Sequence, residues 1–225
     1  MREIVLDTET TGLDPRSCDR LVEIGCIELD NHVPTGRTYH QYVNPERDMP
    51  AEAFAVLGLS EAFLAKHPIF SDVADGFLEF IGDSDLVIHN ASFDLGFINA
   101  ELKRLGRAPV DSARAIDTVQ MARSKYPGAQ ASLDALCRRF EIDLSARTKH
   151  GALLDAELLA DVYLELVGGR QPGFELASQR KAETAATVEL RSGPARPPRP
   201  HGPSDAERAA HEKFMEQITD PIWRD

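Results

Sequence analysis

The sequence predicts an α/β fold in which a mixed sheet is flanked by helices. Three runs rich in β-branched or alternating residues come first and indicate an antiparallel meander. Further short strands then alternate with helical segments, a pattern that favours parallel pairing with helices on the faces of the sheet. Beyond this region, a stretch poor in large apolar residues predicts a flexible C-terminal tail.

The first half of the chain supplies the meander and three helices. The strands are expected at "EIVLDTE" (3–9), "RLVEIGCIELD" (20–30) and "RTYHQYVNP" (37–45). Gly58 and Pro68 punctuate two short helices, expected over 50–58 and 60–68. A longer helix is expected over 70–82, because Ser71 suits an N-cap and apolar residues follow on one face.

The second half alternates strands and helices. "DLVIHN" (85–90) is typical of a buried strand, and the helix that follows it is expected to end at Gly106. "RAIDT" (114–118) predicts one more brief strand. Three further helices are expected over 118–128, 132–142 and 151–169.

Charge and cysteine content limit the class of protein. The 225 residues carry a formal net charge of -12, and the whole acidic excess lies within residues 1–176. Such a surface disfavours broad, non-specific binding of nucleic acid. The start of the chain does not resemble a signal peptide, no apolar run approaches the roughly 20 residues of a membrane helix, and the three cysteines lack metal or redox spacing. We therefore expect a cytoplasmic protein.

Acidic residues stand where strands end and helices begin. Asp7 and Glu9 lie two apart at the end of the first strand and so share one of its faces. Asp94 follows the buried strand at 85–90. His150 and Asp155 are five apart, about 140° around a helix, so they converge only if His150 precedes the helix and Asp155 lies in its first turns.

Four carboxylates at one place require a neutralising cation. Hard oxygen ligands select Mg²⁺ or Mn²⁺, and two such ions can clamp an in-line phosphoryl displacement. A neutral His150 is suited to accept a proton from the attacking water. Each acid taken alone is more simply an exposed strand end or an ordinary helix-start residue. Their joint occurrence favours a metal site with two divalent cations.

Three segments resemble the motifs of a known family. "DTETTG", "HNASFD" and "HGALLDAELLADVY" are similar to the three exonuclease motifs of the DEDDh 3′–5′ exonucleases, over roughly residues 2–167. The resemblance implies a ribonuclease-H-like fold for a domain spanning residues 1–170. It also implies that Asp7, Glu9, Asp94 and Asp155 bind the metals and that His150 is the general base.

The resemblance also implies a substrate site. Thr8, Thr10 and Gly12 would line the 3′-terminal nucleotide, and His89, Asn90 and Phe93 would shape the pocket beside Asp94. Leu57 departs from the family, in which histidine is common at this place. Within the family the resemblance is closest to the proofreading subunits of bacterial replicative polymerases, which remove mismatched nucleotides from a DNA 3′ end. An RNA-directed exoribonuclease of the same superfamily and a non-catalytic scaffold are the alternatives.

Two segments beyond the domain suggest tethers. Residues 171–203 begin with Gln171, Phe174 and Leu176, spaced like peptides that bind the bacterial sliding clamp, and continue as a predicted disordered linker. Residues 204–225 carry an amphipathic run and the lone tryptophan; the resemblance assigns them to binding the polymerase alpha subunit, through Phe214, Ile218 and Trp223. Either segment could instead pack on the nuclease domain. A small accessory subunit is a further possible partner.

Overall fold

The computed structural model describes residues 1–145, 147, 150–169 and 202–217. The chain divides into two compact units, residues 1–175 and 176–225, which are described separately. Among the described residues, no helix combines the length and the apolar character needed to cross a membrane.

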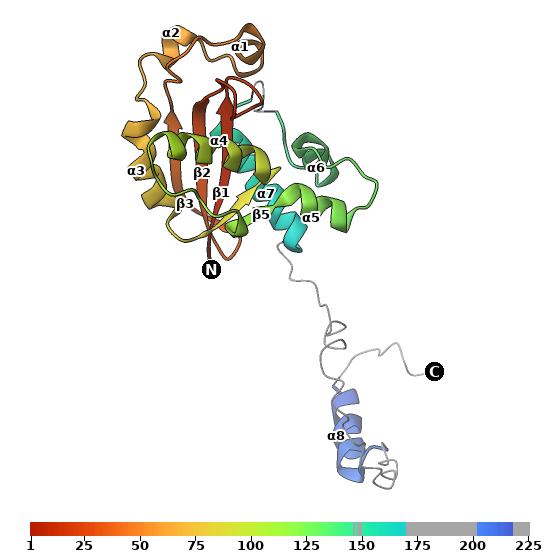
Figure 1. The fold of residues 1–225 in the computed structure, drawn as a ribbon. Coiled ribbons are helices and arrows are strands. Elements are labelled where there is room, and N and C mark those ends of the chain that lie inside the picture. Colours follow the sequence, from red (N-terminus) through yellow and green to blue (C-terminus); the bar gives the residue numbers. More distant parts are fainter. Residues whose placement is uncertain (146, 148–149, 170–201, 218–225) are drawn as a thin grey trace, which may run out of the picture. The chain divides into compact units, whose positions relative to one another are not determined.

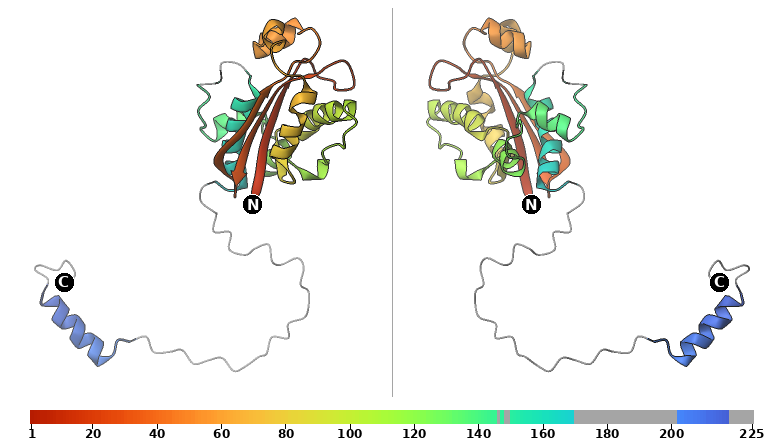
Figure 2. Two further views of the ribbon diagram at one scale, coloured as in Figure 1. Left: turned by 90° about the vertical axis from the view of Figure 1, so that its left-hand side faces the viewer. Right: turned by 90° about the vertical axis from the view of Figure 1, so that its right-hand side faces the viewer.

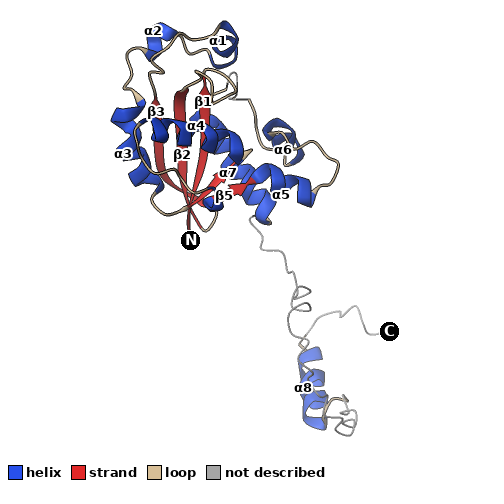
Figure 3. Cartoon of the chain, in the orientation of Figure 1, coloured by secondary structure: helices blue, strands red, loops and turns tan. Residues whose placement is uncertain are grey.

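A five-stranded mixed sheet forms the centre of the first unit (Figures 1 and 3). Its order is β3-β2-β1-β4-β5, with antiparallel pairing from β3 to β1 and parallel pairing from β1 to β5. The predicted meander followed by parallel strands is therefore confirmed. The strands are β1 (Arg2–Thr10), β2 (Leu21–Asp30), β3 (Val33–Tyr42), β4 (Asp85–Ile88) and β5 (Ala115–Asp117).

The helices lie where the sequence predicts them, with two corrections. They are α1 (Ala51–Leu57), α2 (Glu61–Leu64), α3 (Phe70–Ile81), α4 (Ala91–Arg104), α5 (Thr118–Lys125), α6 (Leu133–Arg139) and α7 (Ala152–Val167). The N-cap predicted at Ser71 is wrong: Ile69 caps α3, because a β-bridge to Asn44 keeps it extended just before the helix. Helix α2 is shorter than expected: it ends at Leu64, and the backbone then tightens into i→i+3 turns that reach His67, the residue before Pro68.

The sheet is covered on both faces, and each face has its own core (Figure 2). Ile4 and Leu6 of β1 pack into the cluster that contains residues of α3 and α4, whereas Val5 packs into the cluster with α5, α6 and α7. Because side chains alternate along a strand, Asp7 and Glu9 lie on the α7 side and Thr8 on the α4 side.

The second unit contains helix α8 (Asp205–Met215). Ser204 and Glu207 form a capping box at its start, in which each side chain bonds the backbone N–H of the other residue. Phe214 is 58% exposed on this helix. Most of the predicted linker, together with Ile218 and Trp223, lies outside the described residues.

Candidate active site

Strand β1 and helix α4 bring the first three acids together. Asp7 and Glu9 close β1, and Asp94 lies in the first turn of α4 after Asn90, whose φ of 71° turns the chain into the helix. The side chain of Asp94 is buried, and Thr8 fixes it from β1. Thr8 donates its backbone N–H and its hydroxyl to Asp94 Oδ1, at 3.0 and 2.7 Å. Strand and helix are thus joined at the acidic cluster.

Helix α7 supplies the fourth acid, and a glycine allows its approach. Gly25 of β2 pairs with Asp7, and a Cβ added to Gly25 would lie 2.3–2.4 Å from backbone atoms of Ala152 and Leu153. The first turn of α7 therefore rests directly on the sheet. This close approach places Asp155, 4% exposed, beside the acids of β1.

His150 converges with Asp155 as the spacing predicts. It precedes Gly151, the N-cap of α7, and Asp155 lies in the first turn. His150 Nδ1 is 3.1 Å from Asp155 Oδ2. One ligand atom from each of Glu9, His150 and Asp155 lies within 4.8 Å of the others, so the three residues form a candidate cation site.

Burial and mutual repulsion perturb the acids. Burial raises the pKa of Asp7 well above its usual value, and repulsion from Asp94 and Glu9 raises it further. Burial, with repulsion from Asp155 next, raises the pKa of Glu9 to about 8. Burial also raises the pKa of Asp94 to about 7, although the hydrogen bonds from Thr8 favour its charged form. Positive charge placed among these groups would therefore be stabilised.

Arg147 is the member of this cluster that sequence reasoning missed. Its Nε and one terminal nitrogen bind the two oxygens of Asp155, each at 2.6 Å, and its other terminal nitrogen pairs with Asp134 of α6. It also lies 2.8 Å from His150 Nδ1. Only 11% of the Arg147 side chain is exposed. Its position three residues before His150 was the one available signal.

The two contacts of His150 Nδ1 require opposite tautomers. Donation to Asp155 places the proton on Nδ1 and leaves Nε2 able to accept one, whereas acceptance from Arg147 places the proton on Nε2. Only the first arrangement suits a general base that acts through Nε2. Arg147 is therefore placed to influence which tautomer His150 adopts as well as the orientation of Asp155.

Of the predicted substrate residues near β1, two line a cavity and one instead bonds Asp94. Thr10 and Gly12 line a cavity of about 290 Å³ beside Glu9, together with Leu13 and with Leu57 of α1. A Cβ at Gly12 would lie 2.3–2.5 Å from the carboxylate of Asp19, so a larger residue there would displace that side chain. Thr8 lines neither of the two cavities beside the acids; its hydroxyl is engaged by Asp94.

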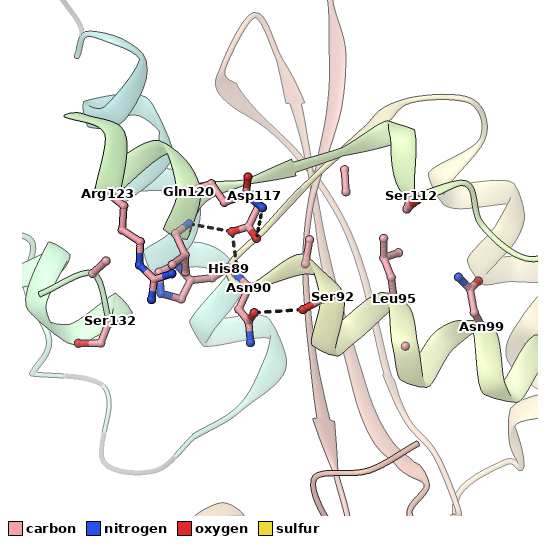
Figure 4. A pocket seen from close by; sticks show the side chains of 15 residues that line it. His89, Asn90, Ser92, Leu95, Asn99, Ser112, Asp117, Gln120, Arg123 and Ser132 are labelled. Atoms are coloured by element: carbon pink, nitrogen blue, oxygen red, sulfur yellow. Dashed lines mark hydrogen bonds between the residues drawn. The ribbon is translucent and has the colours of Figure 1, made fainter. Parts of the chain in front are cut away.

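The residues predicted around Asp94 also separate. His89 and Asn90 line a larger cavity of about 840 Å³ beyond α4 (Figure 4). His89 Nδ1 lies 2.9 Å from the hydroxyl of Thr118, and burial lowers the pKa of His89. Phe93 lines neither cavity; it packs against the core, with its ring centroid 5.1 Å from that of Phe97.

The structure describes only one of the residues predicted to bind partner proteins. Gln171, Phe174, Leu176, Ile218 and Trp223 lie outside the described residues, so their roles stay predictions. Phe214 is the one member of that set within the described part of the chain, and it is exposed on α8.

Comparison with known proteins identifies the family. Residues 4–163 match the RNase_T family model, described as an exonuclease. DNA polymerase III subunit epsilon of Rickettsia felis is 50% identical over 222 residues, covering 97% of each chain. The subunit of the same name from Escherichia coli K12 is 41% identical over 236 residues, covering 99% of this chain and 97% of the relative.

Solved structures agree on the fold. Exonuclease X in complex with 5′ overhanging duplex DNA superposes with a TM-score of 0.60 at 26% identity, covering 73% of this chain and 90% of that one. The nuclease domain of 3′hExo, a DEDDh member bound to rAMP, gives 0.65 at 18% identity and covers 74% and 91%. These matches confirm the predicted exonuclease fold, and the chain belongs to the RNase_T exonuclease family and, within it, to the epsilon subunits of DNA polymerase III.

Proposed function

We propose that this chain is a proofreading 3′–5′ exonuclease that hydrolyses the last phosphodiester bond at a DNA 3′ end and releases a nucleotide 5′-monophosphate. The observation that carries the proposal is the convergence of carboxylates from β1, α4 and α7 at one end of the sheet, with His150 beside them. Its relatives of 41–50% identity over nearly the whole chain are polymerase subunits, which supports DNA as the substrate.

The donor set fits divalent cations. Among the described residues, Arg147 contributes a single positive charge to a cluster of four carboxylates. Burial, with repulsion between neighbouring acids added to it, raises the pKa values of Asp7, Glu9 and Asp94. Oxygen ligands of this kind select Mg²⁺ or Mn²⁺, and cysteine is absent from the set. Bound there by the four acids, two such ions would supply the charge that draws in a phosphate and lowers the pKa of a water molecule.

The protein's own residues position the reaction. Asp155 accepts the Nδ1–H of His150 in the tautomer that leaves Nε2 free, so His150 can take a proton from the attacking water. Thr8 holds Asp94 against rotation through two hydrogen bonds. Arg147 grips both oxygens of Asp155 and ties α7 to α6 through Asp134. These contacts fix the carboxylates before substrate arrives.

The cavity beside Glu9 suits the terminal nucleotide. Leu13, Val56 and Leu57 give it an apolar side for a base, and Thr10 with Gly12 brings the backbone close. Leu57 also belongs to a core cluster with Val22 and Leu64, which explains why an apolar residue is accommodated there. A base pair must open before its nucleotide can occupy such a cavity, so a mismatched terminus reaches it at lower free-energy cost.

Weak intrinsic binding of DNA is expected and implies tethering. The chain carries a net charge of -12, so long-range attraction to phosphate is poor outside the metal site. We propose that residues 204–225, including Phe214, Ile218 and Trp223, bind the polymerase alpha subunit, and that Gln171, Phe174 and Leu176 contact the sliding clamp. Deleting residues 204–225 should abolish co-purification with the polymerase and leave nuclease activity intact; losing both would contradict this assignment.

The activity is tested on primers labelled so that release of the 3′ nucleotide is seen. Wild-type protein with Mg²⁺ should release the terminal nucleotide, faster from a mismatched than from a matched end, and Asp7→Ala should release none. Equal rates on both ends would remove the basis for proofreading. Faster digestion of an RNA strand of the same sequence would favour an exoribonuclease, and no release by the wild type would leave a scaffold.

A further inference from the structure

A groove lined by both polar and apolar side chains lies beyond α4, next to the acids but not part of them. This α4–α5 groove is the cavity of about 840 Å³, within the size range of ligand sites. It opens where β4 and β5 end, the edge of a parallel sheet at which ligands commonly bind. Figure 4 shows Asn90, Gln120, Arg123 and Ser132 around one end of it and Ser92 on the adjoining turn of α4.

Hydrogen-bond donors in the groove are left available. Arg123 is exposed and has no hydrogen-bond or ion-pair partner within the described part of the chain. The carbonyl of the Asn90 side chain accepts from Ser92, which leaves its amide donors free. Ser132 accepts the N–H of Ala135 at the start of α6 and keeps its own hydroxyl proton. The groove therefore presents one cation and several neutral donors.

The carboxylate in the groove already has hydrogen-bond partners. Asp117 is the one acid among its described lining residues. Its carboxylate accepts the backbone N–H groups of Asn90 and Val119, at 3.3 and 2.9 Å, and the side-chain amide of Gln120. Asp117 keeps its negative charge, but three neutral donors already bind its carboxylate, so it does not hold Arg123 in an ion pair.

The surrounding sequence has the opposite charge from the rest of the domain. Residues 103–149 contain ten Lys and Arg against five Asp and Glu, in a chain whose net charge is -12. Arg138 of α6 is exposed beside a second, shallower hollow of about 590 Å³. Helices α5 and α6 carry four basic residues, Arg123, Lys125, Arg138 and Arg139, against one acid, Asp134. A local basic surface of this kind is the electrostatic pattern expected of a phosphate backbone contact.

We propose that the α4–α5 groove binds the sugar–phosphate backbone of the DNA strand upstream of the scissile bond, with Arg123 pairing with a phosphate. The proposal rests on the proposed function and names a further binding site for it. Asn90 lines the groove and is the N-cap of the helix whose first turn carries Asp94, so one end of the groove lies next to the turn that holds this acid. The cavity beside Glu9 remains for the terminal nucleotide. Donors aimed at a backbone carry no sequence preference, which suits proofreading of any sequence.

The test compares a substrate that has an upstream strand with one that lacks it. One is a short single-stranded DNA, and the other is an aryl ester of thymidine 5′-monophosphate, which carries the scissile ester alone. Arg123→Ala in the full chain should raise KM for the strand about three- to tenfold and leave KM and kcat for the aryl ester unchanged. The slope of log KM against log salt concentration should fall by about 0.7, the contribution of one single-strand phosphate contact.

Arg37→Ala is the matched control. It removes the same charge from an exposed residue on β3, the edge strand farthest from β5, and should leave both substrates unaffected. Arg123→Lys should recover most of the KM. An unchanged KM for the strand, an equal rise for both substrates, or an equal effect of Arg37→Ala would overturn the proposal. So would an unchanged KM with loss of polymerase binding, which would assign the groove to a protein partner. Failure of the wild type to cleave either substrate would instead contradict the proposed function.

Discussion

Gly25→Ala should inactivate the nuclease without touching any catalytic residue. The new Cβ would lie 2.3 Å from Ala152 C and 2.4 Å from Ala152 O and Leu153 N, all of them backbone atoms that cannot rotate away. Ordinary contact begins at 3.4 Å, so the first turn of α7 and β2 must separate by about 1 Å. Asp155 lies in that turn and moves with it.

The magnitude follows from the geometry of catalysis. A misplacement of about 1 Å in a reacting group costs about 100-fold in rate. Overpacking against backbone should also lower the free energy of unfolding by about 1–3 kcal/mol. We therefore expect kcat on single-stranded DNA to fall about 100-fold with KM changed little, because the residues that line the cavity beside Glu9 stay in place.

The assay pairs steady-state kinetics with urea denaturation, so that loss of rate is separated from loss of folded protein. Gly76→Ala in α3 is the matched control, because its Cβ would meet only Tyr39 Cε2, at an ordinary 3.7 Å. It should retain wild-type kcat and equal or greater stability. A Gly25→Ala variant that is folded and keeps kcat within about threefold of wild type would refute the steric argument.

Three further predictions concern the acidic cluster. In the presence of a chelator, the free energy of unfolding measured by urea denaturation should fall as the pH rises from about 4.5 to about 8. The reason is that folded Glu9 holds its proton up to about pH 8, whereas the unfolded residue releases it near pH 4.5. Glu9→Gln should flatten that part of the pH profile. Mn²⁺ at 100 times its Kd should stabilise the wild type by about 2.7 kcal/mol, seen as a higher Tm, and Asp155→Asn at the same concentration should gain less. Arg147→Lys keeps the charge but cannot bind both oxygens of Asp155. In steady-state assays kcat should therefore fall about tenfold with KM unchanged. A wild-type kcat would show that the paired hydrogen bonds to Asp155 are dispensable.

Local pattern was enough to predict most of the fold. Alternation in β1 correctly placed Asp7 and Glu9 on one face, and the five-residue interval correctly placed His150 before α7 and Asp155 within it. The mixed sheet followed from strands that precede, and then alternate with, helices. These features depend on residues close in sequence, which is why a single sequence reveals them.

Contacts between distant segments were not predictable in this way. Arg147 lies in a segment without periodicity, and its grip on Asp155 and Asp134 exists only once α6 and α7 are packed. Thr8 was expected at the substrate, but its hydroxyl serves Asp94, 86 residues away. Gly25 did carry a signal, because glycine inside a buried strand often marks the close approach of another backbone.

The central claim is that the carboxylates of Asp7, Glu9, Asp94 and Asp155 form one site for divalent cations. Anomalous scattering from crystals of the full chain soaked in Mn²⁺ and thymidine 5′-monophosphate tests it most directly. The account predicts two peaks, each about 2.0–2.3 Å from oxygens of these four residues. Peaks absent from the cluster, or confined to other acidic surfaces, would contradict it.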